Sequence, residues 1–269
     1  MVQPRMLVTG STDGIGKAAA VELAKKGAAV IVHGRTEQKA EAARKEIAAA
    51  SDNPGVEAVA GDFSSLSEVR RMAEAMRAHY DRLDVLINNA GVVSKTRMES
   101  ADGYELTFAV NHLAPFLLTN LLLPLLKESA PTRIVVVSSM VHSGADLDLS
   151  DLQMERGYSA QAAYSRSKLA NLLFSGALAR RLSGSGVTVN ALHPGVISTK
   201  LLHASFSGGS APEDGAQTPV YLATSPDVAN VSGRYFVNKT ERAPSATAQD
   251  EELQERLWKI SAELTGLSG

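Results

Sequence analysis

Short, mainly apolar segments alternate with longer helical segments along the sequence, and this alternation restricts the fold more than any single motif does. The predicted strands are residues 6–8, 30–32, 56–60, 85–87, 134–137 and 187–192, and the predicted helices are residues 17–26, 37–50, 65–80, 100–129 and 160–182. Parallel strands need long crossover connections, usually helices, and strands buried on both faces are continuously apolar. The sequence therefore predicts an α/β fold with a parallel sheet covered by helices on both faces, and 269 residues fit one large domain better than two small ones.

The overall composition excludes several classes of function. The net charge is −2, with 27 basic and 29 acidic residues and no long block of either sign, so nucleic acid and acidic membranes are not indicated as partners. The absence of cysteine excludes disulfides, thiolate catalysis and cysteine metal sites, and it fits a reducing compartment. The first strand begins close to Met1, and the apolar tract at residues 113–126 is too short to span a bilayer. We therefore predict a cytoplasmic protein without a membrane anchor.

A glycine-rich turn joins the first predicted strand to the first predicted helix. Glycines let the backbone turn sharply and approach a ligand, and the N–H groups at a helix start favour a phosphate. The spacing differs from the usual dinucleotide pattern G-x-G-x-x-G, and a purely structural turn is the alternative. The residues predicted to contact a cofactor here are Gly10, Ser11, Asp13, Gly14, Ile15 and Gly16.

The next strand ends also carry candidate cofactor contacts. Arg35 follows the second strand, where an acidic residue would bind the ribose of NAD and an arginine can pair with the 2′-phosphate of NADP. Arg35 therefore favours NADP(H), although Asp13 adds negative charge nearby and NAD(H) stays possible. Asp62 and Phe63 can bind and flank an adenine, or can simply begin a helix. After the fourth strand, at the sheet edge where such folds bind ligands, we predict contacts from Asn89, Ala90 and Gly91.

Tyr164 and Lys168 lie four residues apart in a predicted helix and therefore share one face. A phenol titrates near pH ~10, and a neighbouring ammonium lowers that pKa, so the pair can form a tyrosine that exchanges a proton with an alcohol or carbonyl. Taken alone, such a pair is more often a half-exposed helix face. The other motifs decide between the two interpretations.

Together these segments resemble the short-chain dehydrogenase/reductase family over residues 5 to about 240. The matching motifs are T-G-x-x-x-G-I-G at Thr9–Gly16, N-N-A-G at Asn88–Gly91, Y-x-x-x-K at Tyr164–Lys168 and P-G at Pro194–Gly195, all in the family's order. Closer detail, including V-N-H-L at Val110–Leu113 and V-S-S at Val137–Ser139, is similar to the retinol dehydrogenase branch. The resemblance implies a single-domain Rossmann-type fold, a doubly wound parallel sheet over residues 1–269.

The resemblance also implies a role for individual residues. Tyr164 would be the general acid or base, Lys168 would lower its pKa and hold the nicotinamide ribose, and Ser139 would stabilise the substrate oxygen. Asn111 would position a proton-relay water, or would only cap a helix bend. The segment after the sixth strand would cover the cofactor through Pro194, Gly195, Val196, Ile197 and Thr199. Residues 200–215 would form a lid over an apolar substrate, with an irregular surface loop as the alternative.

We therefore predict an NADP(H)-dependent oxidoreductase that interconverts a small-molecule carbonyl and an alcohol. The alternatives are the same chemistry with NAD(H) and a nucleotide-sensing protein that has lost catalysis. The histidines show no metal spacing, so no metal site is predicted. A homodimer or homotetramer is expected, because the family commonly pairs the helices around residues 113–127 and 160–182, both strongly apolar here. The apolar stripe of the tail at residues 249–264 predicts a helix docked on the body.

Overall fold

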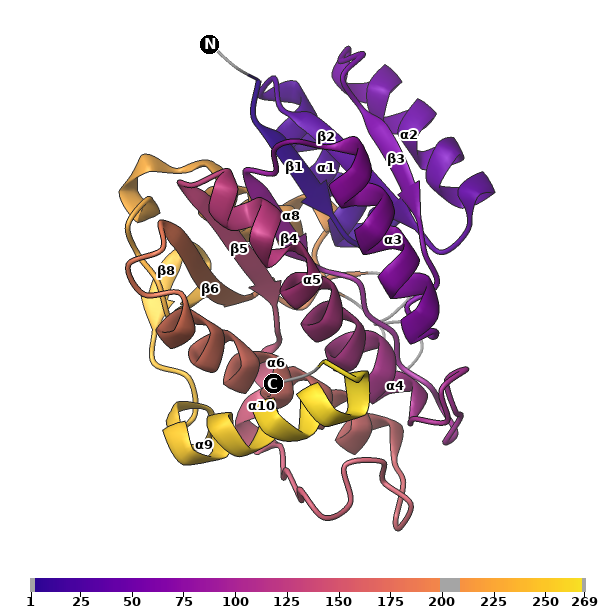
Figure 1. The fold of residues 1–269 in the computed structure, drawn as a ribbon, viewed down its shortest axis with the longest axis vertical. Coiled ribbons are helices and arrows are strands. Elements are labelled where there is room, and N and C mark those ends of the chain that lie inside the picture. Colours follow the sequence, from indigo (N-terminus) through magenta and orange to yellow (C-terminus); the bar gives the residue numbers. More distant parts are fainter. Residues whose placement is uncertain (1–2, 199–208, 268–269) are drawn as a thin grey trace.

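A computed structural model describes residues 3–198 and 209–267 of the chain (Figure 1). Eight strands form one sheet in the order β3-β2-β1-β4-β5-β6-β7-β8. Neighbouring strands are parallel except for the last pair, β7 and β8, which is antiparallel. The strands are β1 (Arg5–Val8), β2 (Ala29–Gly34), β3 (Glu57–Ala60), β4 (Val85–Asn88), β5 (Thr132–Val137), β6 (Val187–His193), β7 (Arg234–Val237) and β8 (Thr240–Arg242).

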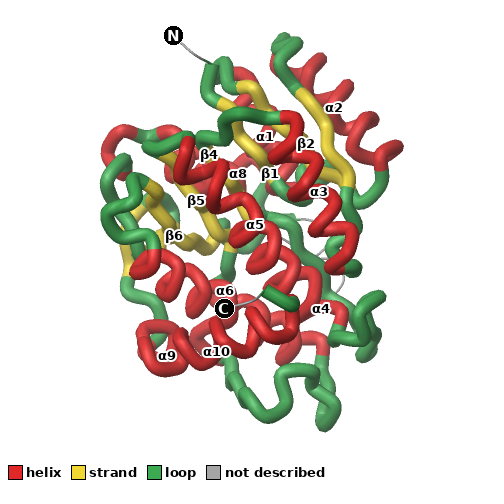
Figure 2. Tube along the Cα trace, in the orientation of Figure 1, coloured by secondary structure: helices red, strands yellow, loops and turns green. Residues whose placement is uncertain are grey.

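Helices cover both faces of the sheet and make two apolar cores (Figure 2). One face carries α3 (Leu66–His79), α5 (Ala114–Glu128) and α6 (Ala160–Arg181), with α10 (Glu251–Thr265) outside them, and the other carries α1 (Gly14–Lys25), α2 (Glu37–Ser51) and α8 (Pro212–Thr224). Shorter turns are α4 (Leu106–Phe108), η1 (Ala109–Leu113), η2 (Met140–Gly144), η3 (Pro226–Val228) and α9 (Ala246–Gln249). The predicted doubly wound, Rossmann-type arrangement is confirmed.

The strand order places a ligand crevice at one point of the sheet. β1 pairs with β2 on one side and with β4 on the other, so the chain winds outward in both directions from β1. The connections on the two sides then cover opposite faces and separate at the carboxyl ends of β1 and β4, where doubly wound sheets bind ligands. The glycine turn after β1 and the N-N-A-G segment after β4 meet at this edge.

The C-terminal third differs most from the predicted elements. Strands β7 and β8 and helix α8 are not in the sequence prediction, and α8 begins at Pro212, inside the predicted lid. Proline suits the first turn of a helix because its missing N–H has no partner to lose there. Residues 212–215 are therefore helical rather than loop, and residues 199–208 lie outside the described part of the chain, so the lid stays a prediction.

The apolar tract at residues 113–126 belongs to a continuous helical run that begins six residues later than the predicted helix at residues 100–129. Leu106–Glu128 spans 23 residues, and its most apolar 18-residue window has a mean hydropathy of 1.5, so this run is long and apolar enough to cross a membrane. However, 78% of its most apolar window is buried inside the protein, as in the core helix of a folded domain. The cytoplasmic location stays a prediction.

Candidate active site

A cavity of about 600 Å³ follows the carboxyl edge of the sheet across β2, β1, β4 and β5, a volume typical of cofactor and ligand sites. Its lining includes most of the predicted cofactor contacts and several residues that the sequence did not single out. The predicted ones are Gly10, Asp13, Gly14, Ile15, Gly16, Arg35, Asp62, Phe63, Asn89, Ala90, Gly91, Tyr164, Lys168 and Pro194; the others include Thr12, His33, Ser64, Val92, Met98, Glu99, Leu106, Val110 and Ser138.

The glycine turn is pressed against the end of β4, which explains its glycines. Gly10 has φ +63°, and a Cβ there would lie 2.7 Å from the Cα of Ala90. A Cβ on Gly16 would overlap the carbonyl oxygen of Gly10. Helix α1 begins at Gly14, two residues before the predicted end of the turn, and the Asp13 carboxylate caps it by accepting the Gly14 N–H at 2.8 Å. The first turn of α1 therefore points N–H groups into the cavity, as a phosphate site requires.

Ser11 does not line this cavity, contrary to the prediction. Its hydroxyl is buried, donates to the Val8 carbonyl at 2.7 Å and accepts the His33 N–H at 2.9 Å. Its own N–H donates to the His33 carbonyl at 3.1 Å. Ser11 therefore joins β1 to β2, and Thr12 takes the cavity-facing position instead.

His33 connects three strand ends beneath the cavity. Its Nδ1 accepts the Gly10 N–H at 2.9 Å, and its Nε2 therefore carries the hydrogen that it donates to the Gly61 carbonyl at 2.9 Å. Burial lowers the pKa of His33 to about 4, so the ring is neutral near pH ~7. Phe63 stacks on this ring at 4.4 Å between centroids and is buried in the core. Phe63 thus lines the cavity, but its ring packs on His33 rather than standing free to flank an adenine.

Two buried neutral histidines predict a loss of stability in mild acid. Burial lowers the pKa of both His33 and His112 to about 4, against 6.5 for an exposed ring. As pH falls from 6.5 towards 4, the unfolded chain binds protons that the folded chain does not. The free energy of unfolding should therefore fall by up to about 1.4 kcal/mol per pH unit for each histidine. Urea unfolding at several pH values measures this slope.

A His112→Asn variant assigns part of this pH dependence. It should remove the contribution of His112 to the slope, while the contribution of His33 remains. An unfolding free energy that stays constant between about pH 7 and pH 5 would contradict the neutral buried state of both rings.

Arg35 and Asp62 stand at the outer end of the cavity, beyond the glycine turn. Arg35 is exposed, and within residues 3–198 and 209–267 no carboxylate forms an ion pair with it. The Asp62 carboxylate accepts the N–H and the hydroxyl of Ser64 at 2.9 and 2.7 Å in the turn before α3. Arg35 is therefore positioned to pair with an anion in the cavity, while part of the hydrogen-bonding capacity of Asp62 shapes the turn.

The N-N-A-G segment is held by the residue before the glycine turn. The Thr9 hydroxyl accepts the N–H groups of Asn89 and Ala90 at 2.9 and 3.1 Å, and the Asn89 amide donates to the Thr9 carbonyl at 2.8 Å. This ladder fixes the ends of β1 and β4 relative to each other. It brings Gly91 next to Lys168, whose Nζ lies 3.7 Å from the place of a Cβ on Gly91.

Tyr164 and Lys168 line the inner end of the cavity, whereas Ser139 lies beside Tyr164 and is not among the lining residues. Helix α6 presents Tyr164 and Lys168 on one face, with Lys168 Nζ 5.4 Å from the centroid of the Tyr164 ring and donating to the Val137 carbonyl at 3.0 Å. The Ser139 hydroxyl lies near the Tyr164 phenol and lowers its pKa. Ser138 instead donates to the Lys168 carbonyl at 2.7 Å, which commits its hydroxyl to the fold and supports the choice of Ser139.

The pKa of Tyr164 is raised, whereas the sequence analysis predicted that Lys168 would lower it. Burial raises the pKa of Tyr164 to about 12, and the nearby Ser139 hydroxyl lowers it only in part. Burial also lowers the pKa of Lys168 to about 8. Removal from water disfavours both charged forms, and at this separation it outweighs the attraction between ammonium and phenolate. The phenol is therefore protonated at neutral pH in this structure.

Asn111 lies in η1, a single π-helical turn, a feature often found at functional sites. Its Oδ1 accepts the Val92 N–H at 2.7 Å, and its Nδ2 donates to the Val92 carbonyl and the Ser167 hydroxyl, both at 3.0 Å. The side chain thus anchors the loop after β4 against α6. These contacts agree with the structural alternative and leave a water-positioning role as a prediction.

Comparison with known proteins now identifies the family. Residues 4–208 match the family model described as short chain dehydrogenase. The chain belongs to the short-chain dehydrogenase family. It is 45% identical to human retinol dehydrogenase 14, over 97% of this chain and 86% of that protein. This places it with the retinol dehydrogenase-like branch, as an NAD(P)-dependent oxidoreductase acting on CH–OH donors.

Solved structures show the same short-chain dehydrogenase fold. A Mycobacterium paratuberculosis protein is 35% identical, with a TM-score of 0.83 over 98% of this chain and 94% of that one. A short-chain dehydrogenase from Escherichia coli CFT073 complexed with NADPH is 26% identical, with a TM-score of 0.73 over 88% and 97% of the two chains. A 3-ketoacyl-(acyl-carrier-protein) reductase from Brucella melitensis complexed with NADH is also 26% identical, with a TM-score of 0.70 over 87% and 95%.

The segment after β6 lies beside the cavity in this short-chain dehydrogenase. Pro194 lines the cavity, Ile197 is buried, and Val196 is 56% exposed. Gly195 has φ +100°, which turns the chain back over the sheet edge. The predicted contact Thr199 lies outside the described residues.

His142 and His112 are engaged in hydrogen bonds inside this short-chain dehydrogenase, whereas His193 Nδ1 is buried without a partner among the described residues. His142 donates from Nδ1 to the Ser139 carbonyl at 2.7 Å and accepts the Ser245 N–H on Nε2 at 3.2 Å. His112 bonds Asn171 and Ser261 inside the core. Across the part of the chain that the structure describes, histidine and carboxylate side chains form no cluster that could bind a metal ion.

Proposed function

We propose that the protein interconverts an apolar alcohol and its carbonyl with NADP(H), and that Tyr164 transfers the proton at the substrate oxygen. The observation that carries the proposal is a cavity lined by Tyr164 and Lys168 at one end and by Arg35 at the other, with Ser139 beside Tyr164. The residues fit a dinucleotide, because the glycine turn and the first turn of α1 form a phosphate cradle between these two ends. The bound nicotinamide would supply the hydride chemistry.

Side chains of the protein supply the proton transfer and the charge stabilisation at the substrate oxygen. In reduction, the Tyr164 phenol donates its proton to the carbonyl oxygen, and its raised pKa keeps it in the acid form. The Ser139 hydroxyl, which lies beside the phenol, donates to the same oxygen as negative charge develops. The Lys168 ammonium, held by the Val137 carbonyl at 3.0 Å, offers its other protons to a ribose hydroxyl and to the tyrosine oxygen.

The preference for NADP(H) rests on Arg35. A guanidinium that lines the cavity and pairs with no carboxylate among the described residues suits a 2′-phosphate. Asp13 opposes this preference less than its charge suggests, since its carboxylate already accepts the Gly14 N–H. The complexes of related structures with NADPH and with NADH support both cofactors for the family.

The apolar character of the substrate is supported by the mouth of the site. Among the described residues, the large apolar side chains that are exposed are Met98, Met140 and Val196, at 52%, 54% and 56%. Met98 lines the cavity, Met140 follows Ser139 directly, and Val196 follows Pro194 by two residues. Exposed apolar side chains gathered at one site indicate an apolar ligand. A retinoid-like alcohol is one candidate, by similarity to retinol dehydrogenase 14.

The direct test is a steady-state assay of reduced-nicotinamide absorbance with aldehydes and ketones of increasing chain length. We expect kcat/KM to rise with chain length and to be higher with NADPH than with NADH. Cofactor binding without turnover of any member of the panel would support the nucleotide-sensing alternative instead.

The lowered pKa of Lys168 predicts a pH limit on the reaction. Burial lowers this pKa to about 8, so the side chain is charged below that pH and neutral above it. We expect kcat/KM for NADPH, which reports the free enzyme, to fall above about pH 8 by up to tenfold per pH unit. A Lys168→Arg variant keeps its charge, so its lower activity should show no such fall. An unchanged kcat/KM of the parent enzyme through about pH 10 would contradict the assignment.

A further inference from the structure

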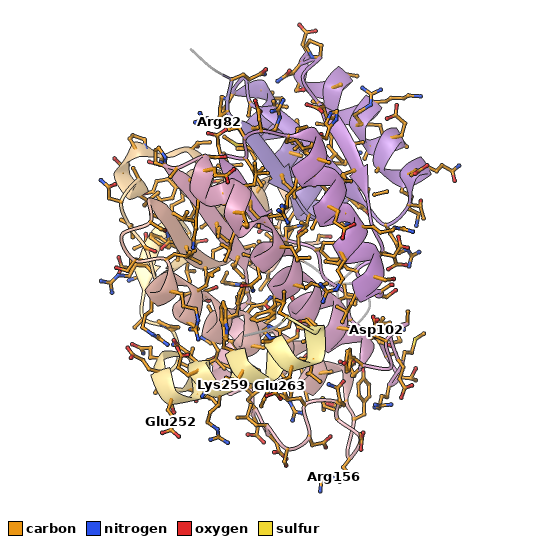
Figure 3. The ribbon with its side chains drawn as sticks, viewed as in Figure 1. Arg82, Asp102, Arg156, Glu252, Lys259 and Glu263 are labelled. Carbon is orange, nitrogen blue, oxygen red and sulfur yellow. The ribbon has the colours of Figure 1, made fainter. Side chains whose placement is uncertain are left out.

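Ser139 stands at the start of a short turn on the outside of the protein. It follows β5 directly and caps η2, and within η2 His142 alone is buried, whereas Met140 is 54% exposed. The loop from η2 to α6 then extends outward as far as Arg156, which lies at the outer edge of the molecule (Figure 3). The turn that carries Ser139 therefore needs support from another part of the fold.

The His142 side chain closes this turn onto the backbone of Ser139. Its Nδ1 donates to the Ser139 carbonyl at 2.7 Å, and the backbone N–H of His142 donates to the same oxygen at 3.3 Å. A carbonyl oxygen has two lone pairs and can accept both hydrogen bonds. The shorter of the two bonds comes from the side chain, so the ring is the stronger tie on Ser139.

The other ring nitrogen of His142 joins the turn to the C-terminal part of the chain. Nε2 accepts the Ser245 N–H at 3.2 Å, across 103 residues of sequence. Ser245 in turn caps α9, where its hydroxyl accepts the Ala248 N–H at 3.3 Å, and Ala248 is buried in the apolar core that α6 shares. Because α9 packs on α6, the ring connects the turn of Ser139 to the helix that carries Tyr164.

These two bonds require a neutral ring with its hydrogen on Nδ1. A carbonyl can only accept and a backbone N–H can only donate, so Nε2 of His142 must lack a hydrogen. Burial lowers the pKa of His142, and the Tyr235 ring meets it edge-on at 5.2 Å between centroids. His193 on β6 is also near, since charge on His142 lowers its pKa. The enclosed ring is therefore suited to holding the backbone rather than to exchanging protons with a substrate.

The same turn determines where the Ser139 hydroxyl points. Its Oγ accepts the Val141 N–H at 3.5 Å as the cap of η2. That bond uses a lone pair and leaves the hydroxyl hydrogen free to donate. In the proposed reaction this hydrogen bonds the substrate oxygen, and hydrogen bonds weaken steeply when distance or angle is poor. An opening of the turn at the Ser139 carbonyl would therefore weaken the bond to the substrate.

We propose that His142 is a positioning residue for the reaction, and that it holds the Ser139 hydroxyl in place through the Ser139 carbonyl. His142 is not among the described residues that line the cavity, so its effect on the substrate must pass through Ser139. The inference rests on the proposed function, because it assigns His142 to the reaction in which Ser139 stabilises the substrate oxygen.

A double-mutant cycle of His142→Ala and Ser139→Ala tests this coupling. Removing one donor to a developing oxyanion costs about 10²- to 10³-fold in kcat, so misplacing that donor in His142→Ala should cost about 10- to 100-fold. KM and the affinity for NADPH should change by no more than a few fold. In the Ser139→Ala background the same change should lower kcat by less than about threefold, because the two residues act as a unit. An unchanged kcat in His142→Ala, or losses that multiply in the double variant, would overturn the inference.

Two conservative variants separate the two hydrogen bonds of the ring. His142→Asn places an amide N–H near the position of Nδ1, whereas His142→Gln places an amide near the position of Nε2. We expect kcat of the Asn variant to stay within a few fold of the parent enzyme and kcat of the Gln variant to fall as in His142→Ala. The reverse order would assign the effect to Ser245 and overturn the inference. Ser143→Ala is the control, because it removes an exposed bond to the Met140 carbonyl in the same turn and should leave kcat unchanged.

Hydrogen exchange of residues 139–145 gives a readout that needs no turnover. Exchange in this segment should be faster in His142→Gln than in the parent protein, and His142→Asn should resemble the parent. Equal exchange in all three proteins would overturn the inference. Absence of turnover in the parent enzyme would instead reject the proposed function, and the exchange comparison would still decide whether His142 holds the turn.

Discussion

Tyr164→Phe should lower kcat by about 10²- to 10⁴-fold in both directions while cofactor affinity stays within a few fold, because the variant loses only the hydroxyl that exchanges the proton. The phenyl ring still lies beside Lys168, whose Nζ is 5.4 Å from the ring centroid, so the cavity keeps its shape. Steady-state kinetics and a separate titration of NADPH binding measure the two quantities on the same preparation. The loss should appear in kcat rather than only in KM, since the proton moves in the transition state.

Tyr158→Phe provides the matched control for this result. Tyr158 is also only part-exposed and near the site, but its hydroxyl donates to the Ser94 carbonyl at 2.8 Å instead of facing Ser139. We expect its kcat to stay within a few fold of the parent enzyme. Equal losses in both variants would mean that Tyr164 acts through packing, and retained turnover in Tyr164→Phe would remove it as the acid.

Arg35→Asp should reverse the cofactor preference. Charge-assisted hydrogen bonds contribute about 1.5 to 3 kcal/mol each, so losing the pair with a 2′-phosphate should weaken NADPH binding by about 10- to 150-fold. The new carboxylate repels that phosphate and can accept hydrogen bonds from the ribose hydroxyls of NADH. The ratio of kcat/KM for the two cofactors should therefore change by at least about 10²-fold, with the substrate held constant.

Two further variants test whether the preference for NADPH comes from a specific contact of Arg35 or from positive charge in general. Arg35→Lys keeps the positive charge but loses the planar fork, so it should give an intermediate ratio. Lys45→Asp reverses an exposed charge on α2 that contacts Glu41, away from the cavity lining, and should leave the ratio unchanged. An NADPH preference that survives in Arg35→Asp would show that other residues choose the cofactor.

Local rules explain what the sequence predicts correctly. The order of strands and helices follows from apolar runs and periodicity, which are properties of neighbouring residues. The shared face of Tyr164 and Lys168 follows from helical spacing, and the turn at Gly10 follows from backbone sterics. The four family motifs then select among α/β folds, because their residue types suit one kind of cofactor site.

Long-range packing decides what the sequence leaves open. Ser11 turns inward because β2 supplies hydrogen-bond partners from His33, about twenty residues away. Burial, which depends on every surrounding element, raises the pKa of Tyr164 although Lys168 lies one helical turn away. In the same way, the apolar faces of α5 and α6 predict that these helices are buried but do not identify the element that covers them. The tertiary structure shows that α10, about seventy residues beyond α6, covers part of these faces, because its Trp258 ring packs on Phe116 and Phe174.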